Sequence, residues 1–536
     1  MKYRITAPQA LSCHIELPAS KSISNRALII DALGGFMHNI DNLASCNDTR
    51  VMIEALSSTH HTIDVGEAGT AMRFLTAYYA ITPGEKVITG SARMLQRPIA
   101  PLVDALQQAG ASVSYLGKVG FPPLRIEGGT IRGGKITIRG DISSQFISAL
   151  LLIAPYMQEG LSLTIEGNIL SRPYIDMTIA MMKYYDIHIA NYYNRIDVYP
   201  GQYNCNKHYS IPFDWSAASY WYEIAYLNRS IYYLNSSYRN TGDLIDYFIS
   251  SLNQDYPVSN YDISPKYSNN DKINYDNSSH NYNNSPDCDN SISCKDNSST
   301  DYYNSTKDFL GNITDYDNSL LNQEISLLNY DISTSGHDNS LSNYDSRTTD
   351  YFTGSSHSLQ GDEKVTQMFG LLSVETIHEE SHIVIAPNDR TPAPDILRLD
   401  LQDTPDLAQT IIVSCVLKKQ FFIISGLHNL PLKETNRIEA LISETAKLGV
   451  ILTQPVEGTL QWLGESCPIH YPIVIDTHND HRMAMAFAPA AITHGEVWID
   501  NPQVVDKSYP SYWQDLIKAG FCITDQQGKE ITICHL

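Results

Sequence analysis

The sequence predicts an α/β protein with more than one domain. It has 536 residues, of which 43% are hydrophobic and 18% are charged. At roughly 100–200 residues per domain, this length allows two to four domains with large apolar cores. A local pattern also recurs along the chain: a β-rich run, a loop ending in Ser, Thr, Asn or Asp, and an apolar helix closed by Gly. This order predicts repeated copies of one βα-type unit.

The copies follow one another from the N-terminus. The run CHIELP (13–18) leads through SKSIS (20–24) into a helix over 25–35 that ends in two glycines. The same order recurs in later segments: 64–80, 135–157, 212–227, 404–417, 433–449 and 478–491. The helix in 102–113 also ends on a glycine before a strand, as is typical of a C-cap. Each loop-to-helix junction offers unpaired backbone N–H groups and the positive end of a helix dipole, so several junctions in one cleft would bind an anion.

Composition and charge exclude several classes of function. The formal net charge of −22 argues against nucleic-acid binding, which needs a basic face. Mean hydropathy is −0.23, and no apolar run reaches the length of about 18 residues that a membrane span needs, so no membrane partner is expected. The N-terminus carries no export or organelle signal, and the nine cysteines form no CxxC pair. These features predict a cytoplasmic protein with reduced thiols, without a disulfide framework or a zinc site.

One segment departs from the globular pattern. Between residues 231 and 356 the composition shifts, and Asn, Ser, Asp and Tyr make up about 62 of the 100 residues from 251 to 350. The same window holds 16 acidic and 5 basic residues, a net charge of −11, which is half of the total of −22. Because it has few aliphatic residues to offset the entropy cost of ordering, we expect a disordered, low-complexity insertion. A partner-binding arm is the alternative.

Basic residues gather at the helix starts and loops of this acidic chain. They are Lys21, Arg26, Arg73, Arg93, Arg97, Lys433, Arg437, Arg482 and Lys507. Arg offers a two-pronged fork for phosphate or carboxylate and Lys offers a point charge, so their placement predicts a ligand with several negative charges. Taken singly, each is more often a solvated surface residue, and each Ser or Thr at these junctions is more often an N-cap.

Two carboxylates lie among these cations. Asp406 lies at the start of a helix in DTPDLAQT, and Glu434 follows Lys433 directly. A carboxylate beside cations normally has a lowered pKa and acts as a base, whereas one buried in a site can be held protonated as an acid. The alternatives are an N-cap for Asp406 and a surface ion pair for Glu434.

Motifs in a fixed order cover nearly all of the chain outside the insertion. They are PASKSISNRALI (from 18), GEAGTAMRFLTA (66–77), RMLQRPIAPLVDAL (93–106), DISSQFISALLL (141–152), SRPYIDMT (171–178), DWSAASY (214–220), NLPLKETNRI (429–438), NDHRMAMAF (479–487) and DKSYPSYW (506–513). This set resembles 5-enolpyruvylshikimate-3-phosphate synthase (3-phosphoshikimate 1-carboxyvinyltransferase), of the enolpyruvate transferase family. Several motifs in order are far more specific than a single Gly-rich loop.

The resemblance implies the architecture. The family fold is a two-domain inside-out α/β barrel of six βαβαββ-like units, with helix N-termini facing the cleft. One domain would be 20–212, and the other would combine 1–19 with 213–536 and carry 231–356 as an insertion. A monomer without a cofactor is implied, with small-molecule substrates and no nucleic-acid or membrane partner.

The resemblance also implies the reaction. The enolpyruvyl group of phosphoenolpyruvate moves to the 5-hydroxyl of shikimate 3-phosphate and phosphate is released, on the way to chorismate and the aromatic amino acids. By motif position, shikimate 3-phosphate would contact Lys21, Ser22, Arg26, Ser143, Ser144, Gln145, Ser171, Tyr174, Asp406, Asn429 and Lys433. Phosphoenolpyruvate would contact Lys21, Gly69, Arg97, Gln145, Arg437, Arg482 and Lys507. A side chain in place of Gly69 would crowd this smaller ligand.

Three residues carry the implied chemistry. Asp406 would handle the proton of the 5-hydroxyl, and Glu434 would be the acid or base at the methylene carbon. Lys21 would stabilise the charge that develops. Since Arg and Lys neutralise the substrates, no metal is implied.

Two residues depart from the motifs of the family, and three others allow a different kind of site. Glu67 stands where the family usually has Asn, and Asn436 stands where it has Asp. Glu67 would weaken anion binding if it pointed inward, and Asn436 would remove a support for the Arg that follows it. His478, Asp480 and His481 together allow a metal site as a minor alternative.

Two other functions are alternatives, and a third is excluded. A UDP-N-acetylglucosamine enolpyruvyl transferase shares the fold and the donor, but usually carries a reactive Cys on the loop before its RP motif, and no Cys lies between 46 and 205. A non-catalytic binding or assembly module on the same fold is the second alternative. A shikimate kinase is excluded, because no GxxxxGK[ST] loop is present.

Overall fold

The computed structural model of the protein describes residues 1–8, 13–228, 232–235, 358–379, 382–388 and 390–531. The chain divides into two compact units, one made of 1–258 and 355–536 and the other of 259–354. The second unit lies outside the described residues, as does most of the predicted insertion. The predicted disorder of that insertion stays a prediction.

The first unit is a mixture of helices and strands, as the sequence predicts. Its described α-helices are α1 (Lys21–Leu33), α2 (Asn47–Ser57), α3 (Gly69–Ile81), α4 (Ala100–Gln108), α5 (Ser144–Ile153), α6 (Arg172–Tyr184), α7 (Trp215–Asn228), α10 (Val365–Gly370), α11 (Ala408–Lys418), α12 (Arg437–Lys447), α13 (His481–Phe487), α14 (Ala491–His494) and α15 (Tyr512–Lys518). Short 3-10 helices are η1 (Met94–Gln96), η2 (Ala154–Tyr156), η4 (Gly361–Lys364), η5 (Pro405–Leu407), η6 (Leu430–Leu432), η7 (Ala488–Ala490) and η8 (Pro502–Lys507). Each segment that the recurring pattern marks as helical contains a helix.

Four sheets of the described residues have four strands each and share one pattern of strand pairing. They are β4 (Thr62–Asp64), β5 (Gly84–Thr89), β7 (Leu124–Gly128) and β6 (Ser112–Tyr115); β8 (Gly134–Arg139), β9 (Leu161–Glu166), β11 (Arg195–Val198) and β10 (Ile189–Asn191); β2 (Cys13–Glu16), β13 (Tyr232–Asn235), β15 (His382–Pro387) and β14 (Val374–His378); and β19 (Val474–Ile475), β20 (Glu496–Asp500), β1 (Lys2–Thr6) and β21 (Cys522–Thr524). In each, the first two strands are parallel and the later pairs are antiparallel.

Two smaller sheets complete the described set. The first is β16 (Ile396–Asp400), β17 (Phe421–Ser425) and β18 (Leu460–Trp462), with the same parallel then antiparallel pairing. The second is the parallel pair β3 (Ile40–Asp41) and β12 (Tyr209–Ser210).

Helices connect the parallel strands. Helix α3 joins β4 to β5, α5 joins β8 to β9, α11 joins β16 to β17, and α13 lies between β19 and β20. A parallel pair needs such a crossover, and the helix then begins just beyond the carboxyl end of the first strand. The start of each of these helices is therefore fixed by the sheet beside it.

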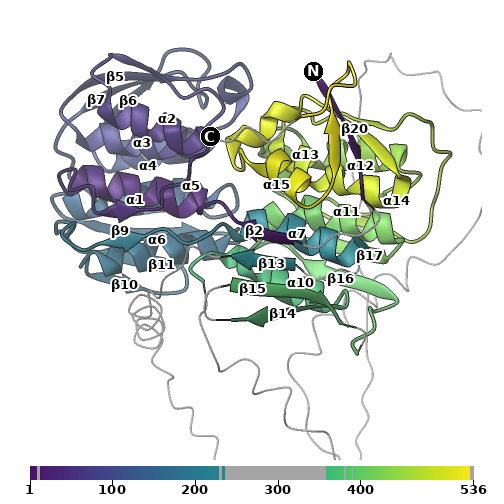
Figure 1. Ribbon diagram of the computed structural model, residues 1–536. Coiled ribbons are helices and arrows are strands. Elements are labelled where there is room, and N and C mark those ends of the chain that lie inside the picture. Colours follow the sequence, from purple (N-terminus) through teal and green to yellow (C-terminus); the bar gives the residue numbers. More distant parts are fainter. Residues whose placement is uncertain (9–12, 229–231, 236–357, 380–381, 389, 532–536) are drawn as a thin grey trace, which may run out of the picture. The chain divides into compact units, whose positions relative to one another are not determined.

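The N-terminal strands pair with distant parts of the chain. β1 lies between β20 and β21, and β2 lies beside β13, so the purple N-terminal strands appear among green and yellow elements (Figure 1). β13 lies at the start of the predicted insertion, 231–356. Its Tyr232 and Leu234 are fully buried, because β13 is an interior strand between β2 and β15.

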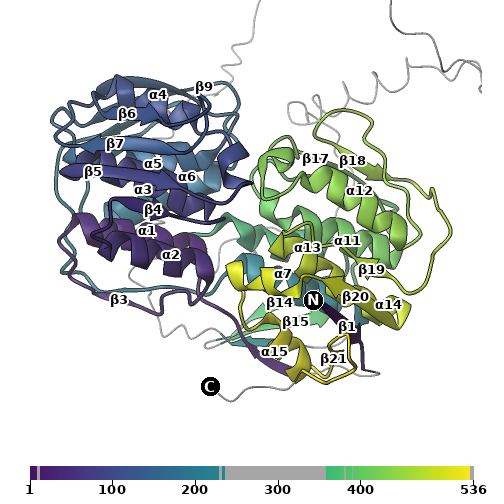
Figure 2. The same ribbon diagram turned by 90° about the horizontal axis from the view of Figure 1, so that it is seen from above.

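Buried apolar residues form two separate clusters. One contains residues numbered between 19 and 211, and the other contains residues between 5 and 17 and between 215 and 523. Elements of the first cluster are drawn in purple to blue, and most of the second in teal to yellow (Figure 2). Both clusters contribute helices whose N-terminal ends carry the residues described next.

Candidate active site

A cavity is lined by residues from the N-terminal ends of α1, α3, α5, α6, α12 and α13. It brings together all of the predicted site residues except Lys507. They are Lys21, Ser22, Arg26, Gly69, Arg97, Ser143, Ser144, Gln145, Ser171, Tyr174, Asp406, Asn429, Lys433, Glu434, Arg437 and Arg482. Helices that contribute to the two hydrophobic clusters therefore meet at one place.

Two cations come from α1. Lys21 Nζ lies 3.2 Å from Asp48 Oδ2. Arg26 is buried, and its guanidinium donates to the hydroxyls of Thr178 at 2.7 Å and Ser148 at 3.2 Å. Burial lowers the pKa of Arg26 to about 10, and no described carboxylate forms an ion pair with it. A buried cation that lacks a counterion favours binding of an anion.

Two further guanidinium groups meet beside α3. Arg73 Nη1 donates to the carbonyl of Gly69 at 3.0 Å, and burial together with the charge of Arg97 holds the pKa of Arg73 well below its usual range. Arg97 is 8% exposed, and its Nε has no hydrogen-bond partner among the described residues. A Cβ on residue 69 would lie 2.7 Å from Arg97 Nη1. Only glycine leaves room for this guanidinium.

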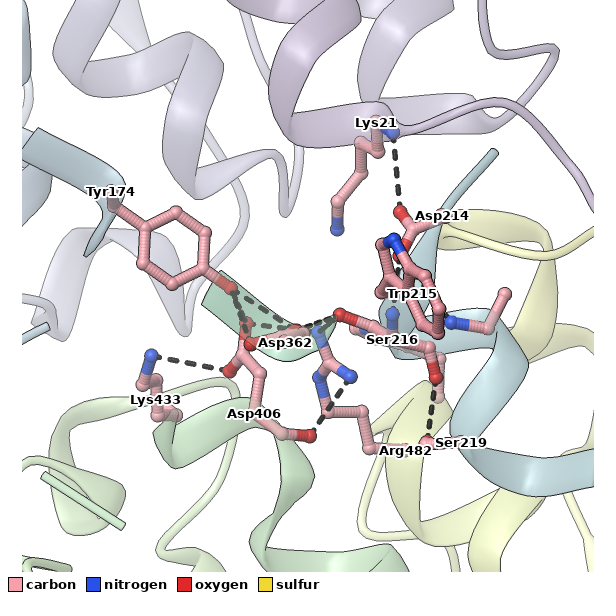
Figure 3. Close-up of polar contacts among 12 residues, drawn as sticks. Lys21, Tyr174, Asp214, Trp215, Ser216, Ser219, Asp362, Asp406, Lys433 and Arg482 are labelled. Carbon is pink, nitrogen blue, oxygen red and sulfur yellow. Dashed lines mark hydrogen bonds and ion pairs between the residues drawn. The ribbon is translucent and has the colours of Figure 1, made fainter. Parts of the chain in front are cut away.

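Asp406 lies among three cations, two of which, Lys433 and Arg482, are labelled in Figure 3. Its Oδ2 is 2.9 Å from Arg482 Nη2, and its Oδ1 is 3.1 Å from Arg437 Nη1 and 3.4 Å from Lys433 Nζ. Burial by itself raises the pKa of Asp406. Arg482, Lys433 and Arg437 outweigh it and hold that pKa well below its usual range. Asp406 is therefore ionised and able to accept a proton.

Glu434 has a similar setting. Its Oε1 is 3.1 Å from Lys507 Nζ and its Oε2 is 3.0 Å from Arg437 Nη2. Burial raises the pKa of Glu434, but Lys507, Arg437 and Arg97 hold it well below its usual range. Arg437 is itself fixed by Asp480 at 2.7 Å. Lys507 does not line the cavity, but it forms an ion pair with Glu434, which does.

Polar neutral groups supply further contacts. Ser143 is the N-cap of α5 and accepts from the backbone N–H of Gln145 at 3.3 Å, so it is both a cap and a cavity residue. Gln145 Nε2 donates to Thr70 Oγ1 at 3.2 Å. Ser171, the N-cap of α6, has a left-handed φ of 56°. The side-chain oxygen of Asn429 is buried without a hydrogen-bond partner among the described residues. These groups can donate to, or accept from, a bound polar ligand.

Sequence reasoning gave no substrate role to Asp48, Thr70 and His481, which line the cavity. His481 is 1% exposed, and neither ring nitrogen has a hydrogen-bond partner in the described part of the chain. Burial, with the charges of Lys21 and Arg482, lowers the pKa of His481 well below its usual range, so the ring is neutral. The sequence signal that could have identified His481 as a cavity residue is its position at a helix start in NDHR, directly before Arg482.

The two departures from the family pattern have structural explanations. The Glu67 side chain is exposed and does not line the cavity, whereas its backbone carbonyl accepts from Lys507 Nζ at 2.9 Å. Asn436 is the N-cap of α12 and accepts from the backbone N–H of Glu439 at 3.5 Å. Support for Arg437 comes from other carboxylates.

The metal site considered as a minor alternative lacks a set of ligands. Among the residues that the structure describes, no group of three or more His, Cys, Asp or Glu side chains is placed to hold a metal ion. Asp480 pairs with Arg437, and His478 Nε2 lies 3.1 Å from Glu444 Oε1.

Comparisons with known proteins agree with one another. The family model described as EPSP synthase (3-phosphoshikimate 1-carboxyvinyltransferase) matches residues 5–63, 55–235 and 354–516. A 3-phosphoshikimate 1-carboxyvinyltransferase from Bacteroides fragilis (strain YCH46) is 38% identical over 524 residues, which cover 98% of this chain and 99% of the relative. The chain belongs to the EPSP synthase family. The predicted family and its 3-phosphoshikimate 1-carboxyvinyltransferase activity are thereby confirmed, and the alternative with UDP-N-acetylglucosamine is not favoured.

More distant members of the EPSP synthase family match as well. The 3-phosphoshikimate 1-carboxyvinyltransferase of Shewanella denitrificans is 27% identical over 94% of this chain and 95% of its own length. The solved EPSP synthase structure from Acinetobacter baumannii matches with a TM-score of 0.58 over 98% of this chain and 100% of that chain, at 15% identity, which shows a shared fold. None of the described helices is long and apolar enough to cross a membrane.

Proposed function

We propose that the chain transfers the enolpyruvyl group of phosphoenolpyruvate to the 5-hydroxyl of shikimate 3-phosphate, with both substrates in the cavity. The observation that carries this proposal is that buried guanidinium groups without ion-pair partners and ionised carboxylates line the same cavity. Arg26, Arg73 and Arg97 are buried and form no ion pair with a described carboxylate, whereas Asp406 and Glu434 are ionised. The first set suits phosphate and carboxylate ligands, and the second suits proton transfer.

Shikimate 3-phosphate is assigned to the side of the cavity formed by α1, α5 and α6. Its phosphate would accept from Arg26 and from the hydroxyls at the starts of α5 and α6, where the helix dipoles also favour negative charge. The full set of contacts proposed for this substrate is Lys21, Ser22, Arg26, Ser143, Ser144, Gln145, Ser171, Tyr174, Asp406, Asn429 and Lys433. Asp406 and Lys433, 3.4 Å apart, would face the sugar-like ring rather than the phosphate.

Phosphoenolpyruvate is assigned to the neighbouring cations. The proposed contacts are Lys21, Gly69, Arg97, Gln145, Arg437, Arg482 and Lys507. Charge-assisted hydrogen bonds of this kind contribute about 1.5–3 kcal/mol each. The unpartnered Nε of Arg97 supports the assignment, because a buried donor without an acceptor costs free energy until an anion arrives.

The proton transfers of the reaction are assigned to the two carboxylates. Asp406 takes the proton of the 5-hydroxyl as its oxygen bonds to C2 of phosphoenolpyruvate, and Glu434 delivers a proton to C3. The product of this step is a tetrahedral ketal phosphate. Glu434 then removes a proton from the new methyl group, the C2–O bond to phosphate breaks, and the proton held by Asp406 leaves with the phosphate. Lys21 stabilises the developing negative charge.

This scheme requires Glu434 to hold a proton after the substrates bind. Without ligand, Lys507, Arg437 and Arg97 keep it ionised. Bound phosphoenolpyruvate brings negative charge to those same cations and weakens their effect on the carboxylate, so the pKa of Glu434 rises. Substrate binding itself would therefore turn this base into the acid of the first step.

The architecture is proposed on the same basis. We assign residues 20–212 to one domain and residues 1–19 with 213–536 to the other, since the two hydrophobic clusters divide at nearly these positions. The repeated sheet order supports the six-unit inside-out barrel of the family. A monomer in the cytoplasm completes the proposal, with the segment after β13 as an insertion in the second domain.

Phosphate release tests the proposed function. Purified full-length protein is mixed with phosphoenolpyruvate and shikimate 3-phosphate, and inorganic phosphate is measured over time. We expect release only when both substrates are present, and none when UDP-N-acetylglucosamine replaces shikimate 3-phosphate. A version with residues 236–357 replaced by a Gly/Ser linker shows whether this segment affects turnover. Absence of release from both folded proteins would overturn the proposal and leave a non-catalytic binding module.

A further inference from the structure

The carboxyl of Asp362 lies behind the cavity and does not line it. Asp362 belongs to η4 and is fully buried. Ser216 Oγ donates a short hydrogen bond to its Oδ2, and the phenol oxygen of Tyr174 lies 3.5 Å from Oδ1 and 3.4 Å from Oδ2. In the described part of the chain, Asp362 forms no ion pair. Its direct polar partners are hydroxyl groups.

Tyr174 lies between two carboxyl groups (Figure 3). Its phenol oxygen is 3.4 Å from Asp362 Oδ2 and also 3.4 Å from Asp406 Oδ2. A phenol has one proton, so it can donate to only one of two ionised carboxylates. Both contacts become hydrogen bonds when one carboxyl is protonated and donates to the phenol oxygen.

The surroundings decide which carboxyl holds that proton. Asp406 has three cations within 3.4 Å, whereas Asp362 has none at such a distance among the described residues. Arg482 donates to Ser216 Oγ at 3.4 Å and to the backbone carbonyl of Asp406 at 3.0 Å, which leaves Asp362 with the serine hydroxyl alone on that side. Of the two carboxyl groups, Asp362 is therefore the one that holds the proton more readily.

We propose that Asp362, as a protonated carboxylic acid, is a positioning residue that donates to the hydroxyl of Tyr174 and directs it to donate to Asp406. This inference rests on the proposed function, in which Asp406 accepts the proton of the substrate hydroxyl. Through Tyr174, Asp362 fixes the orientation of the accepting carboxylate of Asp406 without itself contacting substrate.

The electrostatics of the buried group support this arrangement. Burial, together with the charge of Asp406, raises the pKa of Asp362 to about 6 against the opposing effects of Arg482 and of the hydrogen bond from Ser216. The charged or titratable groups that face it are Asp406 of η5, Arg482 of α13, Asp214 before α7 and Tyr174 of α6. Two anionic substrates in the cavity add negative charge nearby, so the pKa rises again in the complex.

Two substitutions distinguish a carboxylic acid from a carboxylate. In D362N, the amide nitrogen donates to Tyr174 at every pH, while the amide oxygen accepts from Ser216. D362A removes both contacts. We expect D362A to lose about tenfold or more in kcat and D362N to lose less than about threefold, with KM changing little in either.

The pH profile of kcat gives a readout that a purely structural role would not move. In the unmodified protein, kcat falls on the alkaline side as Asp362 loses its proton in the complex. In D362N this fall disappears or moves upward by about one pH unit or more, because the amide does not titrate. In a Y174F background, D362N and the parent should have the same profile. The idea is wrong if D362N is as impaired as D362A at every pH, if D362N keeps the parental profile, or if Y174F does not remove the difference.

A measurement independent of turnover separates this inference from the proposed function. Infrared difference spectra of the full chain between acid and alkaline pH should contain a protonated-carboxyl band that D362N removes and that D515N, at a buried Asp of α15, retains. Loss of the band in D362N supports the inference even if no phosphate is released. An unchanged band in D362N overturns it even if the enzyme is active.

Discussion

Gly69→Ala should weaken the binding of phosphoenolpyruvate specifically. The new Cβ would lie 2.7 Å from Arg97 Nη1, 3.1 Å from Arg97 Nη2 and 3.2 Å from Arg73 Nη1. Ordinary van der Waals contact begins near 3.4 Å, so Arg97 Nη1 must move by about 0.7 Å. Because the atoms in the way are the ends of flexible side chains, the displaced groups are the anion donors and not the core. Loss of one charge-assisted hydrogen bond, about 1.5–3 kcal/mol, predicts a KM for phosphoenolpyruvate about 10- to 100-fold higher.

The assay is phosphate release with each substrate varied in turn while the other is saturating. Gly129→Ala is the matched control, because a Cβ there meets no heavy atom within 4 Å, and it should leave both KM values and Tm unchanged. Tm of Gly69→Ala should also change little. An unchanged KM for phosphoenolpyruvate, or an equal rise in the KM for shikimate 3-phosphate, would refute the placement of Arg97 in the phosphoenolpyruvate site.

Three further predictions follow from partly or fully buried carboxyl groups. Asp406→Asn should lower kcat by about 10²- to 10⁴-fold, as expected for loss of a general base, while calorimetry still detects binding of shikimate 3-phosphate. Binding of phosphoenolpyruvate in the presence of shikimate 3-phosphate should take up protons between pH 6 and 8, measured by calorimetry in buffers of different ionisation enthalpy, and Glu434→Gln should reduce the uptake to the part that belongs to Asp362. Glu223 is fully buried, and burial raises its pKa well above the usual 4.5. Its contribution to stability is therefore complete below pH 4.5 and is lost as pH rises toward the folded-state pKa, so Glu223→Gln should raise Tm at pH 8 more than at pH 4.

The local units and most of the cavity could be predicted from the sequence. Helix starts that combine a capping residue with a cation, such as Lys21 after Ser20, depend on residues close together in the chain. The resemblance of the motifs to a known family then predicted which of these helix starts share one site. Local signals of this kind survive folding, because a helix N-terminus exposes the same unpaired N–H groups wherever it is placed.

Other features depended on contacts that no local pattern contains. Asp362 lies in LQGDEK, just after the compositionally shifted segment, and its importance comes only from Tyr174 and Ser216, 188 and 146 residues away. The predicted insertion begins at 231 although residues 232–235 form β13, because composition does not record the pairing of β13 with β2 and β15. Tertiary pairing decided both cases.

The net charge of the chain is negative, whereas cations outnumber anions among the residues that line the cavity. The chain carries −22 overall, of which −11 falls between 251 and 350. At physiological ionic strength, exposed charges are screened over about 8 Å, whereas buried pairs are screened much less. Asp406 therefore responds strongly to Arg482 at 2.9 Å and Arg437 at 3.1 Å. The same cations that hold Asp406 and Glu434 ionised are those that substrate anions would engage, so binding and proton transfer are coupled through one set of guanidinium and ammonium groups.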